Sequence, residues 1–508
     1  MFKKRKQTVI IQALFIFILM LTGCKTANEE QTYLPEWESL SNHEAAPEWF
    51  RDAKLGIYFH WGVYSVPAFG SEWYPRNMHF EGHPVYEHHL KTYGHPSEFG
   101  YHDFVPMFKA ENFNADEWAD LFVKAGARFA GPVAEHHDGF AMWDSETTPW
   151  NAMDKGPKRD ITGELAKAIK ARDLKFITTF HHAKQLQRHD SIPENPDGQP
   201  YRLSHYPFFQ EMPPSSDDDT LKYLYGNIPE KKWLKEVWLE KLKEVVNKYQ
   251  PDIMWFDYAL DRIPDSIRQE YCAYYLNEAE KWEKEVVIVR KQDDLPLSFS
   301  VDDLEKSRKN RIGKEPWMTD ETISKGSWCY TQDLEIKESK DVLHVLIDIV
   351  SKNGVLLLNI SPMADGTIPE NQKQVLLDIG DWLDKYGEAI YNTRPWYTFG
   401  EGPTKEPEGH FKYHNEFIKI VYSEKDVRYT TKDNTIYAIF LGCPESSPDI
   451  RLAAFEKEVL PESTIIEDIS LMGCDEPIKW NHDQEGLIIS TPGDIPDEMA
   501  VVFKIRTK

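Results

Sequence analysis

The stretch Asp252-Ile-Met-Trp-Phe-Asp257 decides the fold, because it is a short apolar run with a carboxylate at its end. A strand of this kind is expected to be buried along its length, with Asp257 lying where the strand meets solvent. A carboxylate held there by aromatic neighbours is suited to act as a nucleophile rather than as a solvated surface charge. The stretch therefore predicts a strand whose end carries chemistry.

The same pattern recurs along the chain, where short apolar runs end in His, Glu, Asp, Lys or Arg. The expected strands are Lys54–Gly62, Ala127–His137, Leu174–His182, Asp252–Asp257, Glu285–Lys291, Pro316–Glu321 and Gly354–Ser361. Amphipathic helical patterns separate most of them, at 115–126, 163–173, 231–249, 264–282, 339–352 and 370–386. Strands and helices that alternate at this spacing predict a (β/α)8-like barrel of TIM type. A doubly wound open sheet is the competing fold, but the sequence has no Gly-rich phosphate loop.

The pattern changes after Trp396. Short alternating runs at Phe417–Ser423, Thr435–Cys443, Gly486–Thr491 and Met499–Thr507 are separated by turn residues. They predict an antiparallel β-sandwich at 398–508, following a catalytic barrel at 46–397. The polar, proline-containing segment 187–230 interrupts the barrel pattern, and we expect it to form part of the rim around the site.

The N-terminus reads as an export segment. A basic start, Lys3-Lys4-Arg5-Lys6, precedes an apolar run at 9–21 that is short for a transmembrane helix. Leu21-Thr22-Gly23-Cys24 resembles the bacterial lipoprotein box, which implies a signal peptide at 1–23 and lipidation of Cys24. An uncleaved N-terminal anchor is the alternative. We expect a polar tether at 24–45 and an exported protein, lipid-anchored in the cell envelope on its periplasmic or cell-surface face.

Composition limits the classes of partner. The net charge of −25 over 508 residues argues against nucleic acid and against anionic membrane surfaces, so the lipid anchor is the only membrane contact expected. A neutral ligand such as a glycan fits this charge. The 16 Trp and 24 Tyr include rings that can stack on sugars. The five cysteines form no C-x-x-C pair, which indicates neither a zinc site nor a disulfide framework.

Several candidate binding residues follow the expected strands. They are His60, Glu72 and Trp73 in the next loop, His136, His137, His181 and Trp255. Neighbouring residues of a strand point to opposite sides, so the His136-His137 pair is not expected to chelate one ion. We therefore expect no metal and no cofactor. Imidazoles and a carboxylate offer directional hydrogen bonds to hydroxyls, and the rings offer apolar faces, which predicts a sugar-binding pocket.

Hydrolysis of a glycoside needs a second carboxyl group beside Asp257. The chain offers Glu305 in Val301-Asp-Asp-Leu-Glu-Lys306, and Asp320 and Glu321 in Pro316-Trp-Met-Thr-Asp-Glu-Thr-Ile323. Glu315 is a weaker candidate. The residues alone leave the choice among these carboxyl groups open.

Taken as a set, the motifs resemble the α-L-fucosidases of glycoside hydrolase family 29. The matching pieces, in family order from about Trp49 to Trp396, are His60-Trp61-Gly62, Glu72-Trp73-Tyr74, His136-His137-Asp138-Gly139-Phe140, Trp255-Phe256-Asp257, Trp317-x-Thr-Asp320, Ser327-Trp328 and Leu356-Leu-Leu-Asn-Ile-Ser-Pro-x-x-Asp-Gly366. The resemblance implies a retaining exo-glycosidase that needs no metal. It implies that Asp257 is the nucleophile and that His60, Glu72, Trp73, His136, His137 and Trp255 hold the fucose ring. Lys291 or Arg290 matches a position from which a basic side chain reaches the sugar.

The acid/base residue varies across that family. Many members carry Glu directly after the Trp that Trp317 resembles, where this chain has Met318, and others carry a carboxylate some 13 residues earlier, which is Glu305 here. Glu305 is therefore the predicted acid/base, with Asp320 and Glu321 as alternatives. The expected substrate is a fucosylated glycan or oligosaccharide. A related hydrolase that prefers α-L-galactosides, and a non-catalytic glycan-binding lipoprotein, are the alternative functions.

Overall fold

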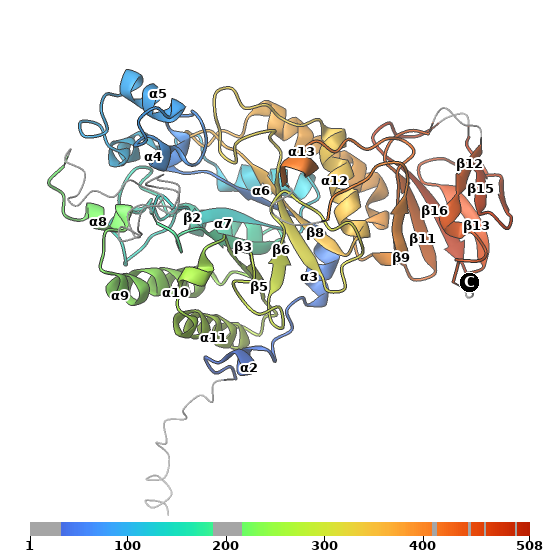
Figure 1. The fold of residues 1–508 in the computed structure, drawn as a ribbon, viewed down its shortest axis with the longest axis horizontal. Coiled ribbons are helices and arrows are strands. Elements are labelled where there is room, and N and C mark those ends of the chain that lie inside the picture. The colour runs from blue at the N-terminus through green and yellow to red at the C-terminus, as the bar shows by residue number, and fades with distance from the viewer. Residues whose placement is uncertain (1–31, 186–215, 409–413, 445–448, 462–463, 493–494) are drawn as a thin grey trace, which may run out of the picture.

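The computed structural model describes residues 32–185, 216–408, 414–444, 449–461, 464–492 and 495–508. Its first part is a closed barrel of eight parallel strands, which confirms the predicted fold class (Figure 1). In order around the barrel, the strands are β1 (Leu55–Phe59), β2 (Phe129–Glu135), β3 (Lys175–Phe180), β4 (Ile253–Phe256), β5 (Val287–Arg290), β6 (Val301–Asp303), β7 (Trp317–Thr322) and β8 (Gly354–Ile360). Pairing of β1 with β8, from Leu55 opposite Leu356, closes the ring.

Helices cover the outside of the barrel at the predicted positions. They are α6 (Ala115–Lys124), α7 (Ile161–Lys170), α10 (Leu239–Tyr249), α11 (Asp265–Lys281), α12 (Ser339–Ser351) and α13 (Glu370–Tyr386). The connections 291–300 and 304–316, which are described throughout, contain no helix. The three-residue strand β6 between them was not predicted, because two of its three residues are acidic and it has no apolar run.

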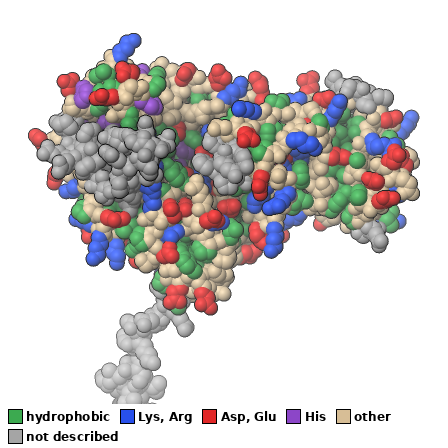
Figure 2. Space-filling view, viewed as in Figure 1, with side chains coloured by type: hydrophobic (Ala, Val, Ile, Leu, Met, Phe, Trp, Pro, Cys, Tyr) green, Lys and Arg blue, Asp and Glu red, His purple; other side chains and the backbone are tan. Residues whose placement is uncertain are grey.

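Shorter elements form the rim above the strand ends. They are the α-helices α4 (Tyr74–Asn77), α5 (Pro84–Thr92), α8 (Leu221–Tyr225) and α9 (Glu230–Trp233), with 3₁₀ turns at Val63–Ser65, Tyr101–Met107 and Leu260–Arg262 and a π-helical turn at Leu234–Trp238. Of the segment 187–230 predicted for the rim, residues 187–215 lie outside the described part of the chain. Its remainder packs at the end of β3, where Gln185 Nε2 donates to the Leu224 carbonyl at 2.9 Å. Histidines of the rim show in purple beside α5, and charges of both signs are interspersed over this face (Figure 2).

Side chains alternate between the barrel interior and the helical shell. In β4, Ile253 and Trp255 belong to the interior cluster, whereas Met254 and Phe256 pack against the helices. By this two-residue period, Asp257 continues the inward-facing row at the carboxyl end of the strand. Parity along the strands therefore decides which of two neighbouring polar residues can reach the centre of the barrel mouth.

Strand β2 departs from simple alternation near its end. The register against β3 shifts between Val133 and Glu135. Glu135 faces outward and pairs with Lys241 of α10 at 2.7 Å, with both side chains fully buried. A β-bulge re-aims the side chains that follow it, and here it turns His136 toward the barrel axis.

The second part of the chain consists of two antiparallel sheets around a shared core, as predicted. The five-stranded sheet has the order β13 (Ile466–Leu471), β16 (Val501–Thr507), β11 (Thr435–Phe440), β10 (Val427–Lys432) and β9 (Arg394–Glu401). The three-stranded sheet is β12 (Asp449–Leu452), β15 (Leu487–Ser490) and β14 (Trp480–His482), and 3₁₀ turns lie at Gly387–Ala389 and Ala453–Phe455. Strand β9 begins at Arg394, before the predicted boundary at 398.

The strand predicted at Phe417–Ser423 is wrong. Phe417 ends the short helix α14 (His414–Phe417), and turns follow it. Its apolar residues serve a different purpose, because Phe417 and Tyr422 are buried against the barrel rather than paired in a sheet. Alternation alone could not distinguish this packed turn from a strand.

Part of the segment predicted as a polar tether, residues 32–45, packs against the barrel. Residues 32–45 contain the helix α2 (Trp37–Leu40), which packs on α11, and the Tyr33 N–H donates to Asn277 Oδ1 at 3.0 Å. The helix α3 (Glu48–Ala53) then leads into β1. The predicted signal peptide at 1–23 and Cys24 lie outside the described residues. Among the helices that the structure describes, none is long and apolar enough to cross a membrane.

Candidate active site

A cavity of about 230 Å³ opens at the carboxyl ends of the barrel strands. Its walls consist of His60, Glu72, Trp73, His136, His137, His181, Asp257, Tyr258, Lys291, Glu305, Asp320 and Trp328. Pockets for drug-sized ligands measure about 300–1,000 Å³, so this smaller cavity suits a single sugar ring. Active sites of barrels of this kind lie at the same end of the strands.

Lys291 is the centre of the site. Its Nζ lies 3.1 Å from Asp257 Oδ1, 3.1 Å from Glu305 Oε2 and 3.3 Å from Asp320 Oδ2. A fourth carboxyl oxygen, Asp303 Oδ2, is 3.8 Å away. The side chain of Lys291 is only 4% exposed, so one ammonium group balances several carboxyl groups with little help from water.

Asp257 is held in its ionised form. Burial opposes its charge, but Lys291, His181 and His137 outweigh that cost and keep the pKa of Asp257 well below its ordinary value. His137 Nε2 lies 3.4 Å from Asp257 Oδ2, whereas Lys291 Nζ contacts the other oxygen, Oδ1. The result is a buried carboxylate that faces the cavity with its charge intact, as a nucleophile requires.

The pKa of Glu305 is shifted in the opposite direction, upward. Burial and the neighbouring Asp320 and Asp257 raise its pKa, although Lys291 works against them. Because Glu305 Oε2 and Asp257 Oδ1 each lie 3.1 Å from the same nitrogen, these two oxygens are no more than 6.2 Å apart, the sum of the two distances. Retaining glycosidases hold their two carboxyl groups about 5–5.5 Å apart and inverting enzymes about 6.5–9.5 Å apart. The geometry favours the retaining arrangement.

Asp303 is a site residue that the sequence reasoning missed. It faces inward from β6 beside Asp320, and burial together with Asp320 raises the pKa of Asp303 well above its ordinary value. Tyr58 donates its hydroxyl proton to Asp320 Oδ2 at 3.0 Å, so Asp320 is already an acceptor. These contacts favour the neutral form of Asp303. The signal was present in the parity of 301, 303 and 305, but β6 was not recognised as a strand.

Three histidines, His60, His136 and His181, line the cavity together with the carboxyl groups. His60 Nδ1 lies 2.8 Å from Asn359 Oδ1, and the ring of His181 is 4.5 Å from that of His136, centroid to centroid. Burial lowers the pKa of His60 to about 4 and the pKa values of His136 and His181 well below their ordinary value. The rings are therefore neutral at pH 7 and can donate to or accept from hydroxyl groups.

The same three imidazoles are the described residues that could hold a metal ion. One nitrogen from each of His60, His136 and His181 lies within 4.8 Å of the others. Sequence adjacency had pointed only to the His136-His137 pair, whereas the barrel brings the third ligand from another strand. Because neutral imidazoles serve hydroxyl groups equally well, this cluster does not require a metal, and the absence of a metal stays a prediction.

Glu72, Trp73 and Trp328 form the remaining wall. Glu72 Oε2 accepts from the Trp328 N–H at 3.2 Å and from Ser327 Oγ at 3.3 Å, and burial raises its pKa. The Trp73 ring lies 5.1 Å from that of His137, and the Trp328 ring 5.3 Å from that of His60. These aromatic rings flank the polar groups, an arrangement suited to an apolar face and a hydroxylated edge of one ligand.

Three predicted site residues do not reach the cavity. Arg290 faces away from Lys291 and pairs with Asp293 at 3.0 Å and Asp302 at 3.6 Å. Glu321 faces away from Asp320 and pairs with Lys337 at 2.9 Å. Both follow from strand parity, which assigns only one of two neighbours to the interior. Trp255 lies beneath the cavity, fully buried, with Lys291 Nζ 4.6 Å from its ring.

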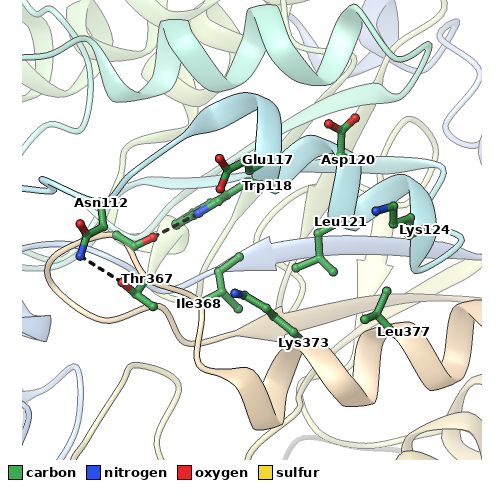
Figure 3. A pocket seen from close by; sticks show the side chains of 11 residues that line it. Asn112, Glu117, Trp118, Asp120, Leu121, Lys124, Thr367, Ile368, Lys373 and Leu377 are labelled. Atoms are coloured by element: carbon green, nitrogen blue, oxygen red, sulfur yellow. Dashed lines mark hydrogen bonds between the residues drawn. The ribbon is translucent and has the colours of Figure 1, made fainter.

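A larger cavity, of about 530 Å³, lies on the outer wall between α6 and α13 (Figure 3). The one aromatic residue among the described residues that line this cavity, Trp118, is only 4% exposed, and its indole N–H donates to the Gly366 carbonyl at 3.2 Å. Asp120 on the same wall is paired with Arg172 at 2.6 Å. This cavity offers neither an exposed aromatic face nor a pair of carboxyl groups with opposed pKa shifts, so the smaller cavity is the candidate active site.

The chain is similar to known proteins over most of its length. The alpha-L-fucosidase family profile matches residues 20–388, and the profile of the alpha-L-fucosidase C-terminal domain matches 422–506. The chain is 31% identical to tissue alpha-L-fucosidase of Rattus norvegicus over 93% of this chain and 92% of that protein, and 30% identical to the Homo sapiens protein over 97% and 96%. The crystal structure of Thermotoga maritima alpha-fucosidase in complex with fucose superposes with a TM-score of 0.73 at 28% identity, covering 93% of this chain and 100% of that one.

Proposed function

This chain is a glycoside hydrolase of the alpha-L-fucosidase family, and we propose that it releases terminal α-L-fucosyl residues from glycans by double displacement through Asp257. The observation that carries the mechanism is Lys291, whose ammonium touches both an ionised Asp257 and a Glu305 with a raised pKa. Two carboxyl groups with opposed protonation preferences, within 6.2 Å through that shared contact, match what retention requires.

In the first step, an oxygen of Asp257 bonds to the anomeric carbon while the bond from that carbon to the glycosidic oxygen breaks. Glu305 gives its proton to the departing oxygen, which leaves as an alcohol. In the second step, the ionised Glu305 takes a proton from water, whose oxygen bonds to the anomeric carbon and displaces Asp257. Two inversions return the original configuration, and both carboxyl groups end in their starting forms.

The neutral histidines and Glu72 are proposed to hold the sugar hydroxyls. His60, His136, His181 and Glu72 all line the cavity, so hydrogen bonds would converge on one ring. The rings of Trp73 and Trp328 would pack on its apolar parts. Glycan partners, and the absence of nucleic acid partners, follow from this neutral-ligand site and the strongly acidic chain.

The alternatives differ in what they predict at this site. The non-catalytic interpretation rested on Met318, but Met318 is fully buried in the barrel interior and Glu305 lines the cavity instead. Preference for α-L-galactosides would depend on the surroundings of the C5 substituent. Parallel turnover of an aryl α-L-fucoside and the matching aryl α-L-galactoside decides between these two sugars.

The experiment that tests the mechanism follows cleavage of a fucosyl disaccharide by ¹H NMR. The first product is expected to be α-L-fucose, which then mutarotates. Asp257→Ala is expected to lower kcat by several orders of magnitude, and added azide should form β-L-fucosyl azide from an aryl fucoside in the emptied space. First appearance of β-L-fucose, or near-parental turnover by Asp257→Ala, would overturn the proposal.

We further propose that the protein is exported and anchored by lipid on Cys24, since Leu21-Thr22-Gly23-Cys24 follows a basic and then apolar start. This placement would bring extracellular glycans to the barrel without a spanning helix. Incorporation of a labelled fatty acid by the full chain, and its loss in Cys24→Ser, is the test. Equal labelling of both chains would contradict the anchor.

A further inference from the structure

Five charged side chains are buried together between the barrel and the C-terminal domain, which lies beside α12 (Figure 1). Asp348 of α12 forms ion pairs with Lys352 Nζ at 2.8 Å and with Arg428 Nε of β10 at 2.6 Å. Glu406 forms an ion pair with Arg428 at 3.2 Å and another with Lys352. None of these side chains is more than 5% exposed. Such a cluster is sensitive to the loss of any one member, because the partner charge stays buried.

The fifth member, Arg308, connects this cluster to the active site. Arg308 Nε lies 3.5 Å from Asp348 Oδ2, and its side chain is 3% exposed. The guanidinium also lies 4.9 Å from the ring centroid of Phe417 and 6.0 Å from that of Tyr422, both in the C-terminal part of the chain. Arg308 stands three residues after Glu305 in the same loop. Through Arg308, the C-terminal part of the chain thus contacts the loop that carries the proposed proton donor.

The loop is also held from β7 and from the end of α12, because Thr319 Oγ1 donates to the Ser307 carbonyl at 2.9 Å and the Gly313 N–H donates to the Lys352 carbonyl at 2.9 Å. Its backbone is tied to β7 at two points, where the Leu304 N–H donates to the Met318 carbonyl at 2.9 Å and the Lys306 N–H donates to the Asp320 carbonyl at 2.9 Å. Residues 304–316 contain no helix or strand. Lys306 takes a left-handed conformation, with φ of +46°, which a non-glycine residue keeps only when its surroundings enforce it. The N–H of Lys306 is bonded to β7, and two residues further on Arg308 contacts Asp348.

We propose that Arg308 is a positioning residue, through which the C-terminal domain sets the place of the Glu305 carboxyl group in the active site. The domain is then part of the catalytic machinery rather than a separate appendage. This inference rests on the proposed role of Glu305 as acid/base. It assigns to Asp348, Phe417 and Tyr422 the task of holding Arg308, and none of the three reaches the cavity.

The test uses leaving groups of different acidity. A 2,4-dinitrophenyl α-L-fucoside departs without protonation, whereas a fucosyl disaccharide needs the proton of a well-placed acid. A loss of folded protein lowers kcat/KM for both substrates by one factor, while a misplaced acid lowers it chiefly for the disaccharide. The ratio of the two kcat/KM values therefore separates positioning from stability.

The full-length chain is compared with Arg308→Met, Arg308→Lys and Glu305→Ala. For Arg308→Met we expect kcat/KM on the disaccharide to fall by about tenfold or more, a part of the about 10²–10⁴-fold that general acid catalysis supplies, and the dinitrophenyl value to stay within about twofold. Arg308→Lys keeps a cation beside Asp348 and should shift the ratio less, and it serves if Arg308→Met does not fold. Trp382→Phe is the matched control, because it breaks a buried bond from α13 to the Ala500 carbonyl, and neither residue belongs to the loop or to the charged cluster.

The outcomes separate the two proposals. If Glu305→Ala itself leaves the ratio unchanged, Glu305 is not the acid, and both its role and this inference fall. If Glu305→Ala changes the ratio but the folded Arg308 variants lower both substrates equally or not at all, only the positioning role is overturned. The same ratio change in Trp382→Phe would also overturn it, since any loosening of the domain would then suffice.

Discussion

Lys291 Nζ lies 3.1 Å from Asp257 Oδ1, and the same nitrogen lies 3.1 Å from Glu305 Oε2. One buried cation therefore sets the separation of the two carboxyl groups and influences both of their pKa values in the same direction. The difference between them comes from their other neighbours, because His181 and His137 add to Lys291 at Asp257 whereas Asp320 opposes it at Glu305. The division of labour between nucleophile and acid depends on this asymmetry.

Replacing Lys291 by Met should raise the pKa of Asp257, because the cation that lowers it is removed. The acidic limb of the pH–activity profile should move to higher pH, and kcat should fall by about 10²–10³-fold, as for the loss of one preorganised charged donor. Profiles of kcat/KM with an aryl fucoside measure both effects. Lys291→Arg, which keeps the charge, is the control and should retain the position of the acidic limb. An unmoved limb in Lys291→Met would refute this role.

Asp303→Asn should be tolerated, because the raised pKa of Asp303 favours its neutral carboxyl form, which an amide resembles. A carboxyl whose pKa is raised by folding contributes its stability below its unfolded pKa and loses that contribution as pH rises through the folded pKa. The melting temperature of the parent should therefore fall more steeply with rising pH than that of Asp303→Asn. Asp320→Asn, which alters the partner of Lys291 and Tyr58, should lose turnover. Inactivity of a folded Asp303→Asn would contradict the neutral assignment.

Glu321 and Glu305 offer a direct comparison between an outward and an inward carboxylate. Glu321→Gln should keep turnover within about threefold, because Glu321 pairs with Lys337 outside the cavity and makes no contact with the sugar site. Glu305→Gln should lose most of its activity on disaccharides. Steady-state kinetics with a fucosyl disaccharide measures both. A larger loss in Glu321→Gln than in Glu305→Gln would exchange their roles.

The sequence predicted the barrel because its strands and helices alternate in hydrophobic period, and seven of the eight strands carry apolar runs. It could not predict β6, since Val301-Asp-Asp303 has one apolar residue and its burial is imposed by β5 and β7 on either side. The same gap concealed Asp303. Packing supplied by neighbours, rather than local preference, makes this segment a strand.

For the site, the sequence identified the residue types but not which side chains point into the barrel. Arg290 and Lys291, or Asp320 and Glu321, are adjacent, and only the register of each strand in the barrel decides which one points inward. The bulge in β2 adds a shift that no periodicity would reveal. The contact of Arg308 with Asp348 joins residues 40 positions apart, and the contacts of Arg308 with Phe417 and Tyr422 depend on how the C-terminal part of the chain packs on the barrel.

Gly131 in β2 should not accept a side chain. A Cβ at this position would lie 1.7 Å from the Ile177 carbonyl oxygen, which belongs to the neighbouring strand β3. Because that atom is backbone in a closed barrel, Gly131→Ala should destabilise the fold by about 3 kcal/mol or more, at or above the usual range for overpacking. Chemical denaturation measures the change. Gly326→Ala, where a Cβ would meet nothing within 4 Å, is the matched control and should be near neutral. Equal stability of the two variants would show that the barrel relaxes at this point.

The pH dependence of kcat/KM should differ between substrates with different leaving groups. Cleavage of a disaccharide needs Asp257 ionised and Glu305 protonated, so its profile is a bell. Because the pKa of Asp257 is lowered and that of Glu305 is raised, the acidic limb should lie below the ordinary carboxyl range and the alkaline limb above it. As pH rises through the pKa of Glu305, the proton for the leaving oxygen is lost and activity on the disaccharide falls. A dinitrophenyl fucoside needs no such proton, and its alkaline limb should be weak or absent.

Glu305→Gln should abolish the alkaline limb for both substrates while leaving the acidic limb of Asp257. An alkaline limb that persists in Glu305→Gln at the parental pH would assign the proton to another group, with Asp320, 3.3 Å from Lys291 Nζ, the next candidate.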